Sequence, residues 1–200
     1  MPYKNLQQFI KGLEASGELH RVSAEVGHEL EITEIADRVS KSCGPALLFE
    51  RVKGFSYPLL INAFGSYKRM QLSLSCKSFD EIALRLESNI KMRPPEGFMD
   101  KIRMLFTLKE IAGFIPKKVK TAPCQERIYT DGALLDRLPI LKCWPLDGGP
   151  FITLPIVITK DPDTGIQNAG MYRMQKYDNL STGMHWQYNK DGTRHLDKYK

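Results

Sequence analysis

The stretch NAGMYR at residues 168–173, with GMHW following at residues 183–186, decides the fold of the second half of this chain. Between the two stretches lies a cluster of turn-forming residues, namely Asp178, Asn179, Ser181, Thr182 and Gly183. Turn formers between two strand-like runs favour a hairpin. The sequence therefore predicts that residues 168–173 and 183–186 are antiparallel neighbours in a sheet.

The side chains of the first stretch divide between two faces, because successive residues of a strand point to opposite sides of a sheet. Asn168, Gly170 and Tyr172 share one face. Ala169, Met171 and Arg173 share the other. With His185 on the neighbouring strand, we expect an amide, a guanidinium and an imidazole to converge near the sheet edge.

The first half of the chain alternates between two kinds of apolar pattern. Apolar residues at helical spacing predict helices at about 6–16, 29–39, 78–88 and 99–109. Helix-breaking residues after some of these runs, and acidic or capping residues before others, support the prediction. Short apolar runs bounded by Gly or Pro predict strands at 19–22, 46–49 and 58–63. Helices that alternate with strands indicate an α/β layer.

The composition changes at Cys124, after which β-branched residues, prolines and turn formers dominate. A strand is expected at 152–159, a tight connection at 161–165 and the start of a helix at 193–200. We place a domain boundary near 115–125. The predicted class is α+β, with a small α/β domain at 1–118 and a second, β-rich domain at 119–200.

Composition excludes several classes of protein. A hydrophobic content of 42% over 200 residues is enough to form a real core. No apolar run is long enough to span a membrane, and the first residues lack the pattern of a secretion signal. The four cysteines stand far apart with no zinc-site spacing, so we expect a reduced, cytoplasmic protein without a redox dithiol.

The net charge of +6 lies in residues 101–200, which favours an anionic ligand. Nucleic acid is one such ligand, and Lys117, Lys118 and Lys120 form a small basic cluster. No nucleic-acid motif accompanies this cluster, however, and a solvated surface explains it equally well. A cofactor that bears a phosphate fits the modest local excess better.

Six blocks, in order, resemble the UbiD-like decarboxylases: LEITEIADR at 30–38, GPALLFE at 44–50, residues 54–65, APCQ at 122–125, LPILKCWP at 138–145 and QNAGMYR at 167–173. The resemblance implies that residues 119–200 begin a flavin-binding split β-barrel. It implies prenylated FMN as cofactor, with a divalent cation, Mn²⁺ being favoured, and K⁺. Because members of this family are much longer, the chain looks like an N-terminal portion that lacks the carboxylates for proton transfer and is inactive by itself.

The function that this resemblance implies is non-oxidative, reversible decarboxylation of an aromatic or other unsaturated acid of the 4-hydroxybenzoate type. A role in ubiquinone or menaquinone biosynthesis would follow. Such chemistry needs an electron sink, which no ordinary side chain supplies and a modified flavin does. The implied partners are an aromatic acid substrate, a flavin prenyltransferase that supplies the cofactor, and further copies of the chain in a homo-oligomer. Neither nucleic acid nor a membrane span is expected.

The resemblance also assigns roles to single residues. Arg173 corresponds to the catalytic arginine, whose planar donors contact the flavin and pair with glutamates; an exposed surface ion pair is the ordinary alternative. Asn168 corresponds to a metal ligand that offers a carboxamide oxygen to a hard cation. The other implied cofactor contacts are Thr153, Met171, Tyr172, His185, Trp186, Gln187 and Lys190. For the methionine and the aromatic residues, ordinary barrel core remains the alternative.

Two positions depart from the family pattern. Asn189 stands where many relatives carry a histidine metal ligand, and an amide there leaves the choice of metal open. Asp191 stands where relatives commonly carry a glycine nearby. This difference weakens the interpretation of the segment as a simple phosphate-binding loop.

The same sequence features are also compatible with two other functions. The chain can be a non-catalytic module that binds flavin or packs into an oligomer. It can also belong to an FMN-dependent oxidoreductase built on a similar barrel.

Overall fold

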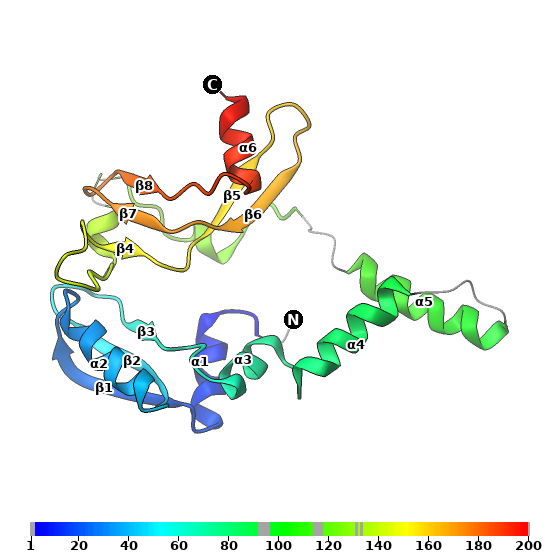
Figure 1. Cartoon of the computed structure of the whole chain (residues 1–200), viewed down its shortest axis with the longest axis horizontal. Coiled ribbons are helices and arrows are strands. Elements are labelled where there is room, and N and C mark those ends of the chain that lie inside the picture. Colours follow the sequence, from blue (N-terminus) through cyan, green and yellow to red (C-terminus); the bar gives the residue numbers. More distant parts are fainter. Residues whose placement is uncertain (1–2, 92–96, 114–117, 131, 133, 200) are drawn as a thin grey trace.

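Two groups of strands organise the chain, and in Figure 1 the blue and cyan group lies below the yellow and orange group. The computed structural model describes residues 3–91, 97–113, 118–130, 132 and 134–199. Three parts of the predictions lie outside these ranges, namely Lys117 of the basic cluster, residues 115–117 of the predicted boundary and residue 200 of the predicted final helix. The mixed helices and small sheets confirm the α+β class.

The first sheet has the order β1-β2-β3, formed by Leu19–Val26, Ala46–Val52 and Leu59–Ile61. β1 and β2 are parallel, which requires a crossover, and α2 (Glu31–Lys41) provides it. β2 and β3 are antiparallel and are joined by a turn in which Gly54 has a φ of +83°. The predicted α/β layer is therefore confirmed.

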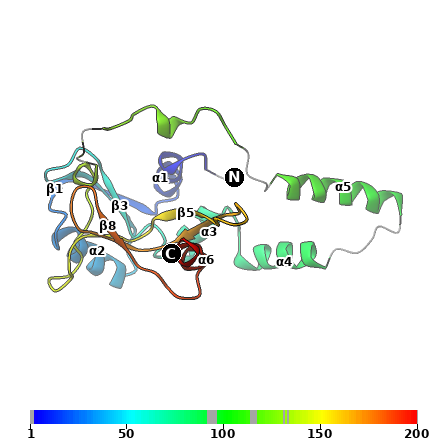
Figure 2. The same ribbon diagram turned by 90° about the horizontal axis from the view of Figure 1, so that it is seen from above.

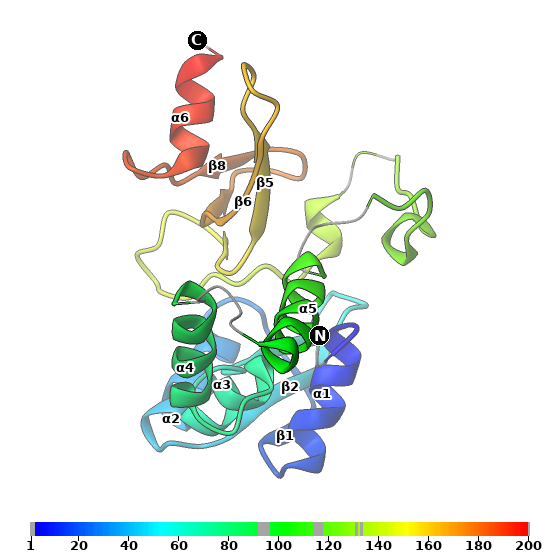
Figure 3. The same cartoon turned by 90° about the vertical axis from the view of Figure 1, so that its right-hand side faces the viewer.

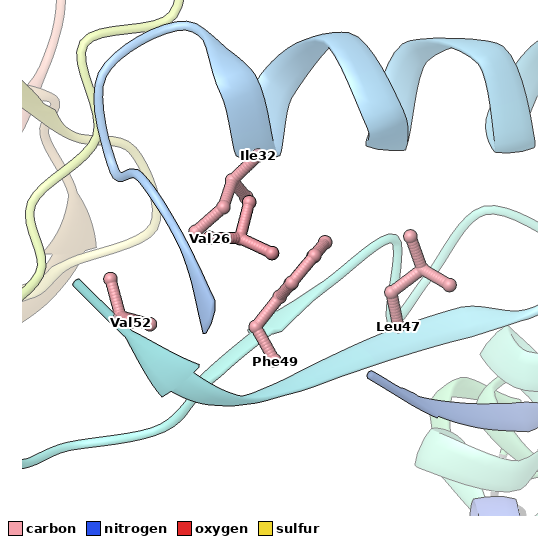
Figure 4. Close-up of a cluster of buried hydrophobic side chains, with 5 residues drawn as sticks. All are labelled: Val26, Ile32, Leu47, Phe49 and Val52. Atoms are coloured by element: carbon pink, nitrogen blue, oxygen red, sulfur yellow. The ribbon is translucent and has the colours of Figure 1, made fainter. Parts of the chain in front are cut away.

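The core of this layer lies between α2 and the sheet, as Figure 4 shows. Its side chains come from β1, α2 and β2, and all are buried: Val26, Ile32, Leu47, Phe49 and Val52. The apolar stripe that predicted α2 is the face that covers the sheet.

A buried ion pair joins α3 (Tyr67–Leu74) to the same layer. The Arg69 side chain is almost fully buried, and its Nη1 donates to Glu18 Oε2 and to the Gly44 carbonyl, each at 3.1 Å. Nearby, α1 (Leu6–Ala15) buries Phe9 and Leu13, and it ends where Ser16 and Gly17 predict. α3 was not predicted from the sequence.

Helices α4 (Phe79–Ile90) and α5 (Phe98–Ala112) project away from both sheets, as Figures 1 and 2 show, and Figure 3 looks at the molecule from the side on which they lie. The Ser78 side chain accepts a hydrogen bond from the Glu81 N–H, so the predicted cap at the start of α4 is present. Large apolar side chains on both helices are exposed, among them Ile90 and Phe98.

The second half contains two small antiparallel sheets and a final helix. Two short 3-10 turns, Pro123–Gln125 and Leu135–Arg137, precede them. One sheet has the order β4-β7-β8, formed by Phe151–Ile152, Met174–Lys176 and Thr182–Met184. The other pairs β5 (Ile156–Lys160) with β6 (Gln167–Met171), and α6 (Asp191–Lys198) stands beside it (Figure 1). Within the residues described, these sheets do not close into a barrel.

The predicted pairing of 168–173 with 183–186 is wrong for residues 168–171, although the chain does turn at 177–181 and the Arg173 carbonyl accepts the His185 N–H at 2.9 Å. β8 pairs with β7, and β6 pairs with β5 across the turn at 161–165. The cause is the tight turn at 177–181, where Asp178 Oδ1 accepts the N–H groups of Leu180 and Ser181. Because such a short turn pairs the residues directly beside it, 174–176 meet 182–184, and residues 168–171 are left for β5.

The single strand predicted at 152–159 is also wrong, because it is two strands in different sheets. Pro155 lies just before β5 and has no N–H to donate to a ladder, so the pairing is interrupted there. Where the structure describes the chain, none of its helices is long and apolar enough to cross a membrane.

Candidate functional site

One face of β6 carries a linked set of polar side chains that packs against α6. In the β5–β6 register, Thr159 stands opposite Asn168 and Val157 stands opposite Gly170. Asn168 Nδ2 lies 3.3 Å from the Tyr172 hydroxyl and 3.5 Å from Thr159 Oγ1. The alternation predicted for Asn168, Gly170 and Tyr172 therefore describes this face.

Tyr172 is the centre of the set, with only 2% of its surface exposed. Its hydroxyl accepts a 2.8 Å hydrogen bond from the Gly192 N–H at the start of α6, and its ring lies 5.6 Å from the Trp186 ring. A Cβ at Gly170 would come within 2.6 Å of the Tyr172 ring, and one at Gly192 within 2.7 Å. Both positions thus require glycine for the tyrosine to fit.

Lys190 ties the start of α6 to β6 on the same side. Its Nζ donates a 2.8 Å hydrogen bond to the Met171 carbonyl and lies 4.9 Å from the centre of the Tyr172 ring. The positive end of the helix dipole and the Lys190 ammonium therefore lie close together. This combination favours an anion such as a phosphate group.

His195, a residue that sequence reasoning missed, closes the set from the inner face of α6. The ring is 8% exposed, and Nδ1 lies 2.9 Å from Thr159 Oγ1. Its only signal in the sequence is its position one turn after Asp191 on an amphipathic helix. Thr159, which contacts both His195 and Asn168, was not predicted either.

The opposite side of this strand region carries Arg173 and Met171. The Arg173 guanidinium lies 4.8 Å from the centre of the Phe151 ring, and the Arg173 carbonyl accepts the His185 N–H at 2.9 Å. The β4–β7 register pairs Phe151 with Gln175 and Ile152 with Met174, so continuing it by one pair places Thr153 opposite Arg173. Met171 is half exposed and stands opposite the exposed Ile156. This side is therefore an open surface with the Arg173 guanidinium at one end and the apolar side chains of Met171 and Ile156 at the other.

The remaining predicted residues lie at the edge of these two groups. His185, Gln187 and Asn189 have exposed side chains, and the Gln187 carbonyl accepts a 2.7 Å hydrogen bond from the Thr193 hydroxyl. Across the described ranges, no hydrogen bond or ion pair links Arg173 to Asn168. The structure therefore brings Asn168, Tyr172, Trp186 and Lys190 together, and it places Arg173 and Met171 on the other side.

The donors of this region suit a phosphorylated cofactor. Lys190 and the start of α6 offer positive charge to a phosphate, and the amides of Asn168 and Asn189 offer neutral oxygens to a hard cation that phosphate oxygens can also ligate. Among the residues that the structure describes, no group of three or more His, Cys, Asp or Glu side chains is placed to hold a metal. A cation here would therefore depend on amide oxygens.

Comparison with known proteins gives the family. Residues 117–200 match the 3-octaprenyl-4-hydroxybenzoate carboxy-lyase Rift-related domain, and residues 10–86 match the N-terminal domain of the same carboxy-lyase. An uncharacterised protein of Archaeoglobus fulgidus is 52% identical over 198 residues, which is 99% of this chain and 40% of that protein. The chain belongs to the UbiD family.

Solved structures of the same class share the fold. Vanillic acid decarboxylase of Sedimentibacter hydroxybenzoicus, in closed form, is 27% identical with a TM-score of 0.77, and the match covers 98% of this chain and 40% of that one. An evolved dimeric form of the UbiD-class enzyme HmfF of Pelotomaculum thermopropionicum, in complex with prFMN, is 26% identical with a TM-score of 0.77, covering 98% and 41%. The chain thus spans about 40% of the length of these relatives.

Proposed function

We propose that the protein is a carboxy-lyase that removes carbon dioxide from an aromatic or other unsaturated acid with prenylated FMN. One observation carries the proposal. In a chain of the UbiD family, the surface with the Arg173 and Met171 side chains and the positively charged start of α6 lie on opposite sides of β6 and meet at Met171, whose carbonyl accepts a hydrogen bond from Lys190. A ring system with a phosphate tail that reaches around the end of this strand can contact both surfaces.

The phosphate end of the proposed site lies at α6. Lys190 and the helix dipole hold the phosphate, and the amide oxygens of Asn168 and Asn189 bind the divalent cation, for which we propose Mn²⁺. The buried Tyr172 and the half-buried Trp186 hold Asn168 and the start of α6 in place. A K⁺ ion belongs to the same proposal.

The ring end of the proposed site lies on the opposite side. Met171 and Thr153 contact the ring, and His185 and Gln187 border it. Prenylated FMN supplies the electron sink that decarboxylation requires. Arg173 keeps its charge at every relevant pH, so it holds an anionic group, either the substrate carboxylate or an acidic side chain, in one orientation.

Several finer points belong to this proposal. The substrate is an acid of the 4-hydroxybenzoate type on a ubiquinone or menaquinone pathway, and the cofactor comes from a flavin prenyltransferase. The protein works in the cytoplasm as a homo-oligomer. The division of the chain falls near residue 118, with the flavin-binding part after it.

The decisive experiment is to express the full-length protein with and without a flavin prenyltransferase and to identify its bound flavin by mass spectrometry. We expect prenylated FMN only with the prenyltransferase, together with release of carbon dioxide from an aromatic acid. Unmodified FMN that turns over with a nicotinamide donor would instead identify an oxidoreductase. A protein that retains prenylated FMN but releases no carbon dioxide from a panel of unsaturated acids would be a binding module.

A further inference from the structure

A cavity of about 470 Å³ lies where the loop between β2 and β3 meets the segment that leads into the second half of the chain. Its size lies within the range of small-molecule sites. It shares no residue with the candidate cofactor site. The lining residues are Gly54, Phe55, Ser56, Tyr57, Arg127, Tyr129, Asp136 and Arg137.

The described residues that line the cavity include more cationic than anionic side chains. Arg127 and Arg137 both line it, and the Arg137 guanidinium lies 4.2 Å from the centre of the Tyr129 ring. Asp136, the single carboxylate among the described lining residues, forms an ion pair with Lys176. The carboxylate among the described lining residues is thus already engaged by a cation from outside the lining.

Two tyrosine hydroxyls add neutral hydrogen-bonding groups to these charges. Tyr57 from the first half and Tyr129 from the second lie with their hydroxyl oxygens 3.3 Å apart. The pKa of Tyr129 is lowered, first by the hydrogen bond with Tyr57, then by a hydrogen bond from Arg127 and by the charges of Arg127 and Arg137. The surroundings of Tyr129 therefore stabilise a negative charge.

We propose that this cavity binds a small molecule through an oxyanion, either a carboxylate or a phosphate. Guanidinium groups recognise both anions through paired N–H donors, and the hydroxyls of Tyr57 and Tyr129 add further donors. The rings of Phe55, Tyr57 and Tyr129 offer apolar surface to the rest of the ligand. Since Tyr57 and Tyr129 come from different halves of the chain, a bound anion links the two halves.

Isothermal titration of the whole 200-residue chain at low salt tests the proposal, with inorganic phosphate and benzoate as separate probes. We expect saturable binding of at least one probe and an affinity at least tenfold lower in Arg127→Gln. The double variant Tyr57→Phe, Tyr129→Phe should also bind more weakly. Arg38→Gln is the matched control, since it removes one charge from an exposed position on α2. Binding of phosphate alone indicates a phosphorylated ligand, and binding of benzoate alone indicates an aromatic acid.

A second readout separates site binding from general charge attraction. A bound anion disfavours the phenolate, so the pKa of Tyr129, followed by NMR with labelled tyrosine, should rise when the probe saturates. Absence of saturable binding, an equal loss of affinity in Arg127→Gln and Arg38→Gln, or an unchanged pKa of Tyr129 at saturation would overturn the proposal. The results for Arg127→Gln and for the pKa of Tyr129 concern residues that the proposed flavin site does not use, so they test this cavity separately from the proposed function.

Discussion

The Tyr172 hydroxyl accepts a 2.8 Å hydrogen bond from the backbone N–H of Gly192, twenty residues further along the chain. This contact fixes the start of α6 against β6, and both Asn168 and Lys190 contact the same tyrosine. The orientation of the proposed phosphate end therefore depends on a buried tyrosine rather than on the exposed residues themselves.

Gly192→Ala should destabilise the protein by about 1–3 kcal/mol, because the new Cβ would lie 2.7 Å from the Tyr172 ring and 2.9 Å from the Trp186 ring. Urea denaturation followed by circular dichroism measures the change. Gly97→Ala is the matched control, since among the described residues the nearest neighbour of its new Cβ would be an Asp100 oxygen at 3.9 Å. Equal stability of the two variants would show that the glycine at 192 is not needed for packing.

Arg173→Ala in the full-length protein should abolish carbon dioxide release, a loss of at least about a hundredfold, while the thermal unfolding temperature stays unchanged. The guanidinium contacts only the Phe151 ring among the described interactions of its side chain, so little stability depends on it. Arg173→Lys should restore little activity, because a lysine keeps the charge without the planar fork. Arg51→Ala, at another exposed position, serves as control, and near-normal turnover in Arg173→Ala would remove the catalytic role.

Asn168→Ala should lower the retention of Mn²⁺ and of flavin in the purified full-length protein, measured by elemental analysis and absorbance. Asn168→Asp separates ligation from packing, because a carboxylate keeps an oxygen for the cation and adds charge. We expect Asn168→Asp to retain more metal than Asn168→Ala. If both variants hold as much metal as the natural protein, Asn168 is not a ligand.

Glu18→Gln should cost about 3 kcal/mol of unfolding free energy, because it leaves the Arg69 guanidinium buried without its anionic partner. Lys68 also contacts Glu18, and its hydrogen bond is the main cause of the lowered pKa of that carboxyl. Glu25→Gln on the exposed side of β1 should change stability little. A chemical denaturation curve for each variant compares the two, and similar midpoints would contradict this role of Glu18.

Acid should weaken the turn between β5 and β6. A hydrogen bond from Lys198, supported by the N–H groups of Asp163 and Thr164, lowers the pKa of Asp161 to about 2. Because this pKa lies below that of an unfolded aspartate, the contribution is complete above about pH 4 and is lost as pH falls toward 2. Asp161→Asn should flatten the dependence of stability on pH in that window. High salt should reduce the difference, since the pair is near the surface. An unchanged slope in the variant would exclude Asp161 as its source.

Local patterns were sufficient to predict most of the first half. Helical spacing gave α1, α2, α4 and α5, and apolar runs gave β2 and β3, because each of these elements carries its own apolar face or cap. α3 was missed, since its amphipathic pattern is weak and its key contact is the buried Arg69, which depends on Glu18 far away in the sequence.

The second half was harder to predict because its strands are short and their partners are set by turns. Alternation correctly placed Asn168, Gly170 and Tyr172 on one side, yet the partner of β6 was wrong. Likewise, the contact of Asn168 with Thr159 forms only when β6 pairs with β5, and the contact of Tyr172 with Gly192 forms only when α6 packs against the sheet. No local pattern contains that information, so the side chains of the proposed site were predicted without their neighbours.

The projecting helices α4 and α5 have a consequence for how the molecule opens. Their apolar side chains remain largely in water, so the amide hydrogens of these two helices are protected by local helical structure rather than by the core. Isolated helices of this length are marginally stable. The pair therefore forms the part of the chain that unfolds and exchanges first, while the Phe49 core stays closed until global denaturation.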